Sequence, residues 1–312
     1  MDDVKKISLS IVIPVYNSED TIDKLVHLLI KELINDYELE IVLVNDSSKD
    51  NSEKICIELY CRYKGIVKFY SLSKNVGEHN AVMAGLNNTN GEFVVIMDDD
   101  FQNPVSEVIK LVSYAKDKDY DVVYTYYDVK QHAWGRNLGS RFNDKVANLM
   151  LKKPKNLYLS SFKLLNKFLV NEVIKYDLPF PYIDGLILRT TSNIGKIKVS
   201  HEKRGSGKSG YTLTKLVSLW LNMFTNFSIL PLRVSIYLGQ LFALFGFVFG
   251  IYTVIEKLTN PEMPIGFSAL AVSISIFAGI QLIALGMIGE YIGRIYLSQN
   301  KRPQFTIKKK YE

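Results

Sequence analysis

Two long runs without a charged residue constrain the fold of this chain more than any other feature of its sequence. The first covers residues 234–255 and the second covers residues 263–289. Each is longer than the ~20 residues that a helix needs to cross the ~30 Å hydrocarbon core of a bilayer. Buried core helices would have a similar composition, but uncharged runs of this length favour membrane spans. We therefore predict a transmembrane hairpin over residues 234–290, with helices at about 234–256 and 264–289.

The residues flanking these runs predict the orientation of the hairpin. A short connector at 256–262 puts both outer ends on one side, and those ends carry basic residues such as Lys215, Arg233 and Arg294. Cytoplasmic flanks are enriched in Lys and Arg. We therefore expect a two-pass protein of the inner (cytoplasmic) membrane, with the large N-terminal part and both termini in the cytoplasm. The net charge of +6 fits an anionic leaflet, although a solvated basic surface explains it equally well, and no nucleic acid partner is expected.

Strand-like and helix-like segments alternate through the first hundred residues. Apolar runs rich in β-branched residues are typical of buried strands, and apolar residues at helical spacing separate them. The expected elements, in chain order, are a strand at 8–15, a helix at 19–33, a strand at 40–44, a helix at 53–63, a strand at 66–72, a helix at 78–86 and a strand at 92–97. This alternation predicts right-handed βαβ units and a mostly parallel α/β sheet, whose ligands bind beyond the carboxyl ends of the strands.

Three consecutive acids in the stretch MDDDFQNP follow the last of these strands. They are not core residues, because unpaired buried carboxylates are costly. In extended backbone Asp98 and Asp100 point the same way, Asp99 points the opposite way, and Gln102 continues the first face if the extension persists. Two carboxylates and an amide oxygen suit Mg²⁺ or Mn²⁺. A helix cap explains one acid but not three, so we predict a metal site at Asp98, Asp100 and Gln102.

Several motifs together resemble the family 2 glycosyltransferases of GT-A fold. They are IVIPVYNSEDTI, EIVLVNDSSKDNS, NVGEHNAVMAGLNNTNGEFVVIMDDDFQNP and GMIGEYIGRIY. The resemblance covers nearly the whole chain and is closest to the polyprenyl-phosphate glycosyltransferases that end in a membrane hairpin. With the patterns above, it predicts a cytoplasmic, Rossmann-like GT-A domain at 1–211, juxtamembrane amphipathic helices at 212–233, the hairpin at 234–290 and a basic cytoplasmic tail at 291–312.

The resemblance implies an inverting transfer of a sugar from a nucleotide-sugar donor, expected to be a UDP-sugar, to polyprenyl (undecaprenyl) phosphate. The lipid-linked product would serve cell-envelope glycan modification or assembly, and the reaction would use Mg²⁺ or Mn²⁺. Relatives often form tetramers, so a homo-oligomer is expected on the same ground. Two alternatives stay open: a membrane glycosyltransferase with a hydroxyl acceptor, on a polysaccharide or a lipid, and a non-catalytic membrane protein that binds nucleotide sugars.

The resemblance also assigns roles to individual residues near the nucleotide. The first loop would bind it through Pro14, Tyr16, Asn17 and Glu19. Asp46 would contact the base, and the nucleotide or its ribose would lie near Asn75, Gly77 and His79. The donor diphosphate would lie beside Asp98 and Asp99, within the pattern DxDxQ that holds the metal. Ordinary turn chemistry is the alternative explanation for Asn75, Gly77 and Asp46.

The string GSGKS at residues 205–209 looks like the end of a nucleotide-binding P-loop. A P-loop needs its first glycine at position 202, where this chain has Glu202, and a carboxylate there would repel polyphosphate. The resemblance instead offers an R-x-x-G-x-S-x-Y element that would bind a lipid-linked phosphate, with candidate residues Arg204, Lys208, Ser209 and Tyr211. A flexible basic linker before a membrane helix is the alternative.

Two stretches depart from the pattern of the relatives. Many relatives carry an acid, a candidate base, in the region matching residues 157–163, but the stretch LYLSSFKLL that begins there has Ser160, Ser161 and Lys163 instead. Further on, Asp184 stands where relatives often have Arg. A phosphate acceptor is already mostly ionised at neutral pH, so it needs no strong base. We keep Asp184 beside Asp98 and Asp100 as a catalytic candidate that either contacts the sugar or bridges to a nearby Lys or Arg. Arg136 and Arg141 are candidate phosphate ligands, with a solvated basic helix face as the alternative.

Overall fold

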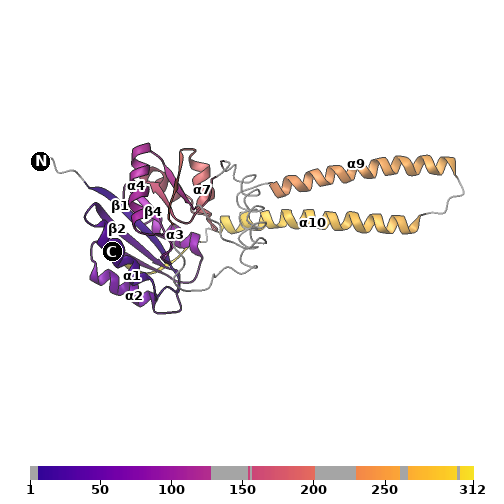
Figure 1. Cartoon of the computed structure of the whole chain (residues 1–312). Helices are drawn as coiled ribbons and strands as arrows, with labels where there is room; N and C mark the ends of the chain where they lie inside the picture. The colour runs from indigo at the N-terminus through magenta and orange to yellow at the C-terminus, as the bar shows by residue number, and fades with distance from the viewer. Residues whose placement is uncertain (1–5, 128–153, 155–156, 201–229, 261–265, 301–302) are drawn as a thin grey trace. The chain divides into compact units, whose positions relative to one another are not determined.

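The computed structural model describes residues 6–127, 154, 157–200, 230–260, 266–300 and 303–312 (Figure 1). The chain divides into two compact units. The first consists of residues 1–211 together with 302–312, and the second consists of residues 212–301. The expected juxtamembrane helices at 212–233 fall almost entirely outside the described residues.

The first unit is organised around one mixed sheet. Its strands are β1 (Ile7–Val15), β2 (Tyr37–Asn45), β3 (Val67–Leu72), β4 (Phe93–Ile96), β5 (Val122–Tyr126), β6 (Lys163–Asn166), β7 (Ile194–Lys198) and β8 (Ile307–Tyr311). They lie in the order β7-β5-β6-β4-β1-β2-β3-β8. The block β4-β1-β2-β3 is parallel, β5 and β7 pair in parallel, and β6 and β8 run antiparallel to their neighbours. The predicted mostly parallel α/β sheet is confirmed.

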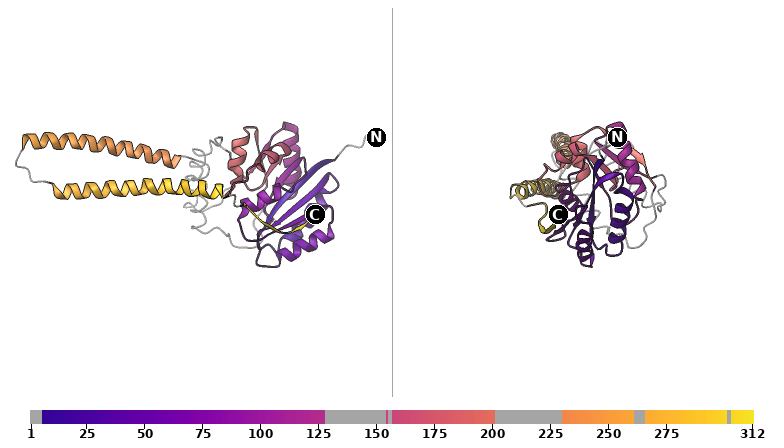
Figure 2. Two further views of the ribbon diagram at one scale, coloured as in Figure 1. Left: turned by 180° about the vertical axis from the view of Figure 1, so that it is seen from behind. Right: turned by 90° about the vertical axis from the view of Figure 1, so that its left-hand side faces the viewer.

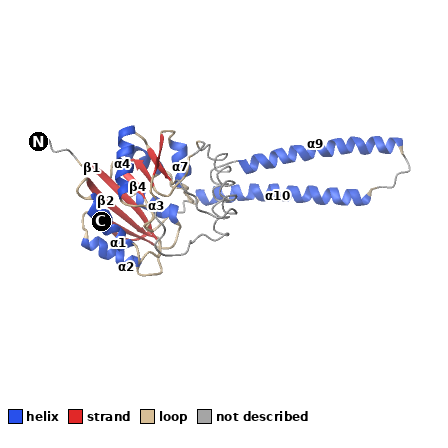
Figure 3. Ribbon diagram, in the orientation of Figure 1, coloured by secondary structure: helices blue, strands red, loops and turns tan. Residues whose placement is uncertain are grey.

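Helices cover both faces of this sheet (Figure 3). They are α1 (Ile22–Leu33), α2 (Ser52–Arg62), α3 (Glu78–Leu86), α4 (Ser106–Lys118), α6 (Lys167–Val173) and α7 (Ile183–Thr190). The apolar stripe of α1 is buried in one core with Leu9, Ile11 and Ile13 of β1. On the other face α3 approaches β1 so closely that a Cβ at Gly85 would lie 2.4 Å from Val12 Cγ1. Burial on both faces explains why the second half of β1, residues 11–15, reads as a continuous apolar run.

The segment that follows the apolar runs returns to the sheet. We expected a basic tail at 291–312, but residues 307–311 form β8, which pairs antiparallel with β3 as an edge strand of the sheet (Figure 2). The ring of Tyr311 packs 5.8 Å from Phe69 and 5.5 Å from Tyr60, centroid to centroid, whereas the three lysines of β8 are exposed. Three adjacent lysines obscure the alternation of a strand, and they also discourage edge-to-edge pairing.

The second unit contains the two apolar helices, α9 (Leu230–Thr259) and α10 (Phe267–Gln299). By length and composition both could cross a membrane, through Ser235–Glu256 and Ile276–Leu297, and neither window is buried. Ser235 Oγ lies 3.4 Å from Met287 Sδ on the other helix. The 33 residues of α10 extend roughly 50 Å, so part of this helix would project from a bilayer core.

Candidate active site

The carboxyl ends of β1 to β4 meet at one edge of the sheet, because these strands are parallel. Tyr16 and Asn17 follow β1, Asp46 follows β2, and the acids Asp98 to Asp100 follow β4. The loop between β3 and α3 supplies Asn75 and Gly77. The structure therefore brings these predicted site residues together at a single edge, as a ligand site of a parallel sheet requires.

The loop that follows β1 is hydrogen-bonded to the loop that follows β2. Asn17 has a left-handed φ of 55°, and its Oδ1 accepts the Lys49 N–H at 2.9 Å. Glu19 Oε2 accepts both the backbone and the side-chain N–H of Asn51, at 2.9 and 2.8 Å. The side chain of Tyr16 is 45% exposed and Pro14 lies within β1. Asn17 and Glu19 thus shape the edge, and nucleotide binding by this loop stays a prediction.

Asp46 joins the end of β2 to the loop after β3. Its Oδ1 accepts the Val76 N–H at 2.7 Å, its Oδ2 accepts the Gly77 N–H at 2.9 Å, and burial raises the pKa of its carboxyl. Gly77 has a φ of 90°, which glycine adopts most readily. The local turn alternative does not hold for Asp46, because Asn45 Oδ1 accepts the Ser48 N–H at 3.1 Å instead. Contact between Asp46 and a base stays a prediction.

The three acids after β4 face different neighbours. Asp98 Oδ2 accepts a hydrogen bond of 2.5 Å from Ser161 Oγ, whereas Asp99 Oδ2 accepts one from Ser18 Oγ. The strand ends at Ile96, the chain bends at residues 99–101, and Phe101 has a left-handed φ of 61°. The alternation argument for Gln102 therefore fails: its backbone N–H donates to Asp100 Oδ1 at 3.1 Å. A place for the Gln102 side chain in a metal site rests on the resemblance alone.

Negative charge is crowded at this edge. Burial first, and then the charge of Glu78, raise the pKa of Asp98 to about 6. Burial and the charges of Asp98 and Asp100 raise the pKa of Asp99 to about 6. A divalent cation would relieve this repulsion, so the carboxylates fit a hard metal ion. Among the described residues no three His, Cys, Asp or Glu side chains form a ready metal shell, so water or phosphate oxygens would have to complete the coordination.

A buried ion pair lies on the β6 side of the acids. Lys163 begins β6 opposite Ile96 and Tyr124, and its Nζ contacts Asp184 Oδ1. The Tyr124 hydroxyl donates to the same oxygen at 2.9 Å, and the two charged side chains are only 5% and 9% exposed. The alternative in which Asp184 bridges to a nearby Lys is therefore confirmed, and contact with a sugar is untested. The sequence marked Lys163 as a departure but gave no sign of its partners.

His79 occupies the first turn of α3, and its ring lies edge-on to Tyr182 with the centroids 5.2 Å apart. Burial lowers the pKa of His79 to about 4, so the imidazole is neutral at physiological pH. It can therefore offer a ligand one hydrogen-bond donor or acceptor, but no positive charge. Its predicted place near the nucleotide is compatible with this edge.

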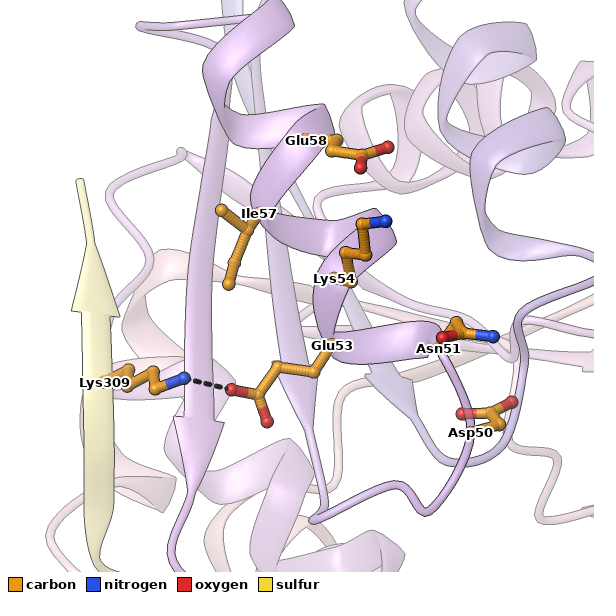
Figure 4. Close-up of a pocket in the computed structure, with 7 residues that line it drawn as sticks. All are labelled: Asp50, Asn51, Glu53, Lys54, Ile57, Glu58 and Lys309. Carbon is orange, nitrogen blue, oxygen red and sulfur yellow. Dashed lines mark hydrogen bonds and ion pairs between the residues drawn. The ribbon is translucent and has the colours of Figure 1, made fainter.

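The candidate phosphate ligands Arg136, Arg141, Arg204, Lys208, Ser209 and Tyr211 lie outside the described residues. A separate groove beside α2 is lined by Asp50, Asn51, Glu53, Lys54, Ile57, Glu58 and Lys309 (Figure 4). None of the predicted site residues lines it. Sequence reasoning missed Ser18 and Tyr124 as polar residues of the carboxyl edge, and only their positions after or opposite the strand ends could have indicated them. It marked Ser161, like Lys163, only as a departure from the relatives.

Comparison with known proteins agrees with the architecture of both units. Residues 10–174 match the family described as glycosyl transferase family 2, and residues 230–295 match the GtrB C-terminal hairpin. Glucosyl-3-phosphoglycerate synthase from Mycobacterium tuberculosis, in complex with UDP, superposes with a TM-score of 0.51 at 17% identity, over 70% of this chain and 79% of that one. The same synthase in complex with Mn²⁺ and UDP-glucose superposes with a TM-score of 0.50 at 18% identity, over 68% of this chain and 75% of that one. These likenesses concern the fold, and they confirm the expected GT-A class.

Two curated relatives extend over nearly the whole chain. One is the undecaprenyl-phosphate 4-deoxy-4-formamido-L-arabinose transferase of Edwardsiella ictaluri, 34% identical over 98% of this chain and 95% of the relative. The other is the enzyme of the same name from Proteus mirabilis, 31% identical over 96% of this chain and 93% of the relative. With the match over residues 10–174, these relatives show that the chain belongs to glycosyl transferase family 2.

Proposed function

We propose that this protein is an inverting, metal-dependent glycosyltransferase that moves a sugar from a nucleotide sugar to polyprenyl phosphate at the cytoplasmic face of a membrane. The observation that carries the proposal is the continuity of two features in one chain. An acidic edge in a family 2 domain is followed by a hairpin of the GtrB type. Two relatives that match nearly the whole chain are named undecaprenyl-phosphate 4-deoxy-4-formamido-L-arabinose transferases.

The donor and metal parts of the proposal rest on the acids after β4. The structural neighbour binds Mn²⁺ and UDP-glucose, which supports a UDP-sugar and a divalent cation here. Asp98 and Asp100 would hold Mg²⁺ or Mn²⁺, and Gln102, the last residue of the DxDxQ pattern, would be the third ligand. The metal would offset the negative charge of the leaving diphosphate. The loop held by Asp46 would position the nucleotide end of the donor.

The acceptor part of the proposal fits the absence of an acid at residues 157–163. An oxygen of the acceptor phosphate would form a bond to the anomeric carbon while the bond from that carbon to the diphosphate oxygen breaks on the opposite face. The configuration inverts, and the nucleoside diphosphate leaves with the electron pair. The second pKa of a phosphate monoester is ~6, so the nucleophile is largely ionised without a base. Asp184, engaged by Lys163 and Tyr124, would position the site instead of taking a proton.

A donor panel tests the proposal. Membranes containing the protein are incubated with labelled nucleotide sugars, undecaprenyl phosphate and Mn²⁺ or Mg²⁺, and the lipid product is identified by mass spectrometry. We expect a sugar linked to the lipid phosphate. Asp100→Ala should lower the initial rate by roughly 100-fold or more, whereas the control Asp117→Ala, on the exposed face of α4, should not. No lipid product from any donor, or equal rates for Asp100→Ala and Asp117→Ala, would overturn it.

The same assay separates the alternatives. A sugar attached to a hydroxyl would favour a polysaccharide or lipid acceptor, and metal-dependent donor binding without turnover would favour a non-catalytic binding protein. Arg204→Ala tests the proposed acceptor loop, because it should weaken the use of polyprenyl phosphate far more than the binding of the donor. Equal losses in both would assign this loop to the nucleotide. Assembly as a homo-oligomer or tetramer stays a prediction.

A further inference from the structure

The exposed large apolar and aromatic side chains of the first unit are unevenly placed. Among the described residues of that unit they are Tyr16, Ile34, Tyr126, Tyr158, Phe168, Leu178 and Phe180. Ile34 and Phe168 lie at the amino edge of the sheet. The Ile34 carbonyl accepts from Lys6, which precedes β1, and Lys167, next to Phe168, donates its N–H to the carbonyl of Glu92, which precedes β4. Tyr16 and Tyr126, in contrast, lie at the carboxyl ends of β1 and β5.

The loop of residues 176–181, YDLPFP, adds an apolar tip to this carboxyl edge. Leu178 is 40% exposed and Phe180 is 41% exposed. Gln304 Nε2 donates to the carbonyls of Tyr176 and Leu178, at 2.6 and 2.9 Å. Two residues further on, the Thr306 carbonyl accepts the N–H of Ser73, at the carboxyl end of β3. The loop is therefore fixed at the same edge as the acids.

Part of the backbone of this loop is already paired within the protein or has no N–H group to pair. Besides the two carbonyls bound by Gln304, the Pro179 carbonyl accepts the Tyr176 hydroxyl at 3.3 Å. Pro179 and Pro181 have no N–H group to satisfy. Backbone groups that enter a lipid environment must be paired within the protein or be absent. Asp177, exposed in the same loop, would stay in the headgroup layer, so the loop can reach the boundary of the hydrocarbon but not its centre.

The chain that fixes the loop comes directly from α10. Gln304 is five residues beyond Gln299, the last residue of α10, and five residues span at most roughly 18 Å. The apolar window of α10 ends at Leu297. A bilayer that holds this helix therefore comes within reach of the loop. We propose that Leu178 and Phe180 insert into the interfacial layer of the bilayer and turn the acidic edge towards the membrane surface; this rests on the proposed insertion of the hairpin.

A single-tryptophan experiment tests the inference on the full chain in vesicles. The sequence has two tryptophans, Trp134 and Trp220, which are first replaced by Phe. Phe180→Trp then reports on the loop, and Phe168→Trp is the matched control, because Phe168 is 54% exposed but lies at the amino edge. In vesicles whose lipids carry bromine on the acyl chains, we expect Phe180→Trp emission to be quenched at least about twofold more than that of Phe168→Trp.

Equal quenching at the two positions, in protein that floats with the vesicles, would overturn this inference and leave the proposed function intact. Protein that does not float would overturn the membrane hairpin and this inference together. Leu178→Trp provides a second reporter if Phe180→Trp fails to fold, since Leu178 has an unstrained backbone whereas Phe180 has a φ of 65°. Stronger quenching of Leu178→Trp than of Phe168→Trp would support the inference, and equal quenching would again contradict it.

Discussion

Asp46 and Asp184 are both buried carboxylates of the first unit, with 4% and 7% of their surface exposed, yet they are satisfied in opposite ways. Asp46 accepts two backbone N–H groups, those of Val76 and Gly77. Asp184 accepts from two side chains, the Lys163 ammonium and the Tyr124 hydroxyl. Nearly any residue can supply a backbone N–H, but only particular side chains can supply an ammonium or a phenol.

This difference decides what each carboxylate contributes. Asp46 fastens two loops and depends on the path of the backbone at the edge of the site. Asp184 is half of an ion pair with Lys163, and removal of one partner from a buried pair leaves the other charge uncompensated. We therefore expect the Asp184 region to be the more sensitive of the two to a single substitution.

Lys163→Met should have the largest effect on stability. It leaves the Asp184 carboxylate buried without its cation, and we expect the free energy of unfolding to fall by about 3 kcal/mol. The double variant Lys163→Met/Asp184→Asn should recover most of that loss, because the amide is neutral and still accepts the Tyr124 hydroxyl. Denaturant unfolding of the full chain in detergent measures both. If the double variant is no more stable than the single one, the ion pair is not the cause.

Asp46→Asn should cost less, about 2 kcal/mol, because the amide oxygen still accepts one N–H while its NH₂ group faces the other. The loop that carries Asn75 and Gly77 would loosen, so we also expect weaker donor binding in a titration with the nucleotide sugar. Unchanged stability together with unchanged donor affinity would show that the bridge to Val76 and Gly77 does not hold this loop.

Asp98→Asn should do the reverse and stabilise the metal-free protein. Burial raises the pKa of Asp98 from 3.8 to about 6, so the folded state holds this proton more tightly than the unfolded state. The contribution of Asp98 to the free energy of unfolding therefore falls as the pH rises from about 4 to 6, and the loss of stability caused by the buried carboxylate persists at higher pH. We expect Asp98→Asn to raise the free energy of unfolding by about 1 kcal/mol at pH 7, since solvent contact reduces the cost of the carboxylate charge, and to leave it unchanged near pH 4. Melting curves with a chelator at both pH values test this, and a gain that is the same at both would contradict it.

Lys309→Ala should have the smallest effect. Its ammonium pairs with Glu53 at 2.7 Å, as Figure 4 shows, but this pair is exposed and solvent screens it. We expect no measurable change in melting temperature, in contrast to Lys163→Met. A clear loss of stability would mean that β8 is held by its charges and not by the packing of Tyr311 on Phe69.

The features that the sequence predicted are the ones that local patterns encode. Uncharged runs indicated the two long helices, alternating apolar segments indicated the parallel sheet, and three acids after a strand marked the site edge. Ile22, Leu25, Val26, Leu29, Ile30 and Leu33 recur at helical spacing, and all six are buried in α1, because a helical stripe is a property of neighbouring residues. Each of these signals lies within about 30 residues, where periodicity determines which side chains share a face.

Only the tertiary structure decided the long-range partners. Asp46 binds residues about 30 positions away, Tyr124 and Asp184 are 60 positions apart, and β8 joins a strand from the other end of the chain. The Phe101 backbone also turns away from the extended path on which the Gln102 prediction depended. Hydrogen bonds and ion pairs of this kind depend on which strand ends the fold brings together, and no local pattern carries that information.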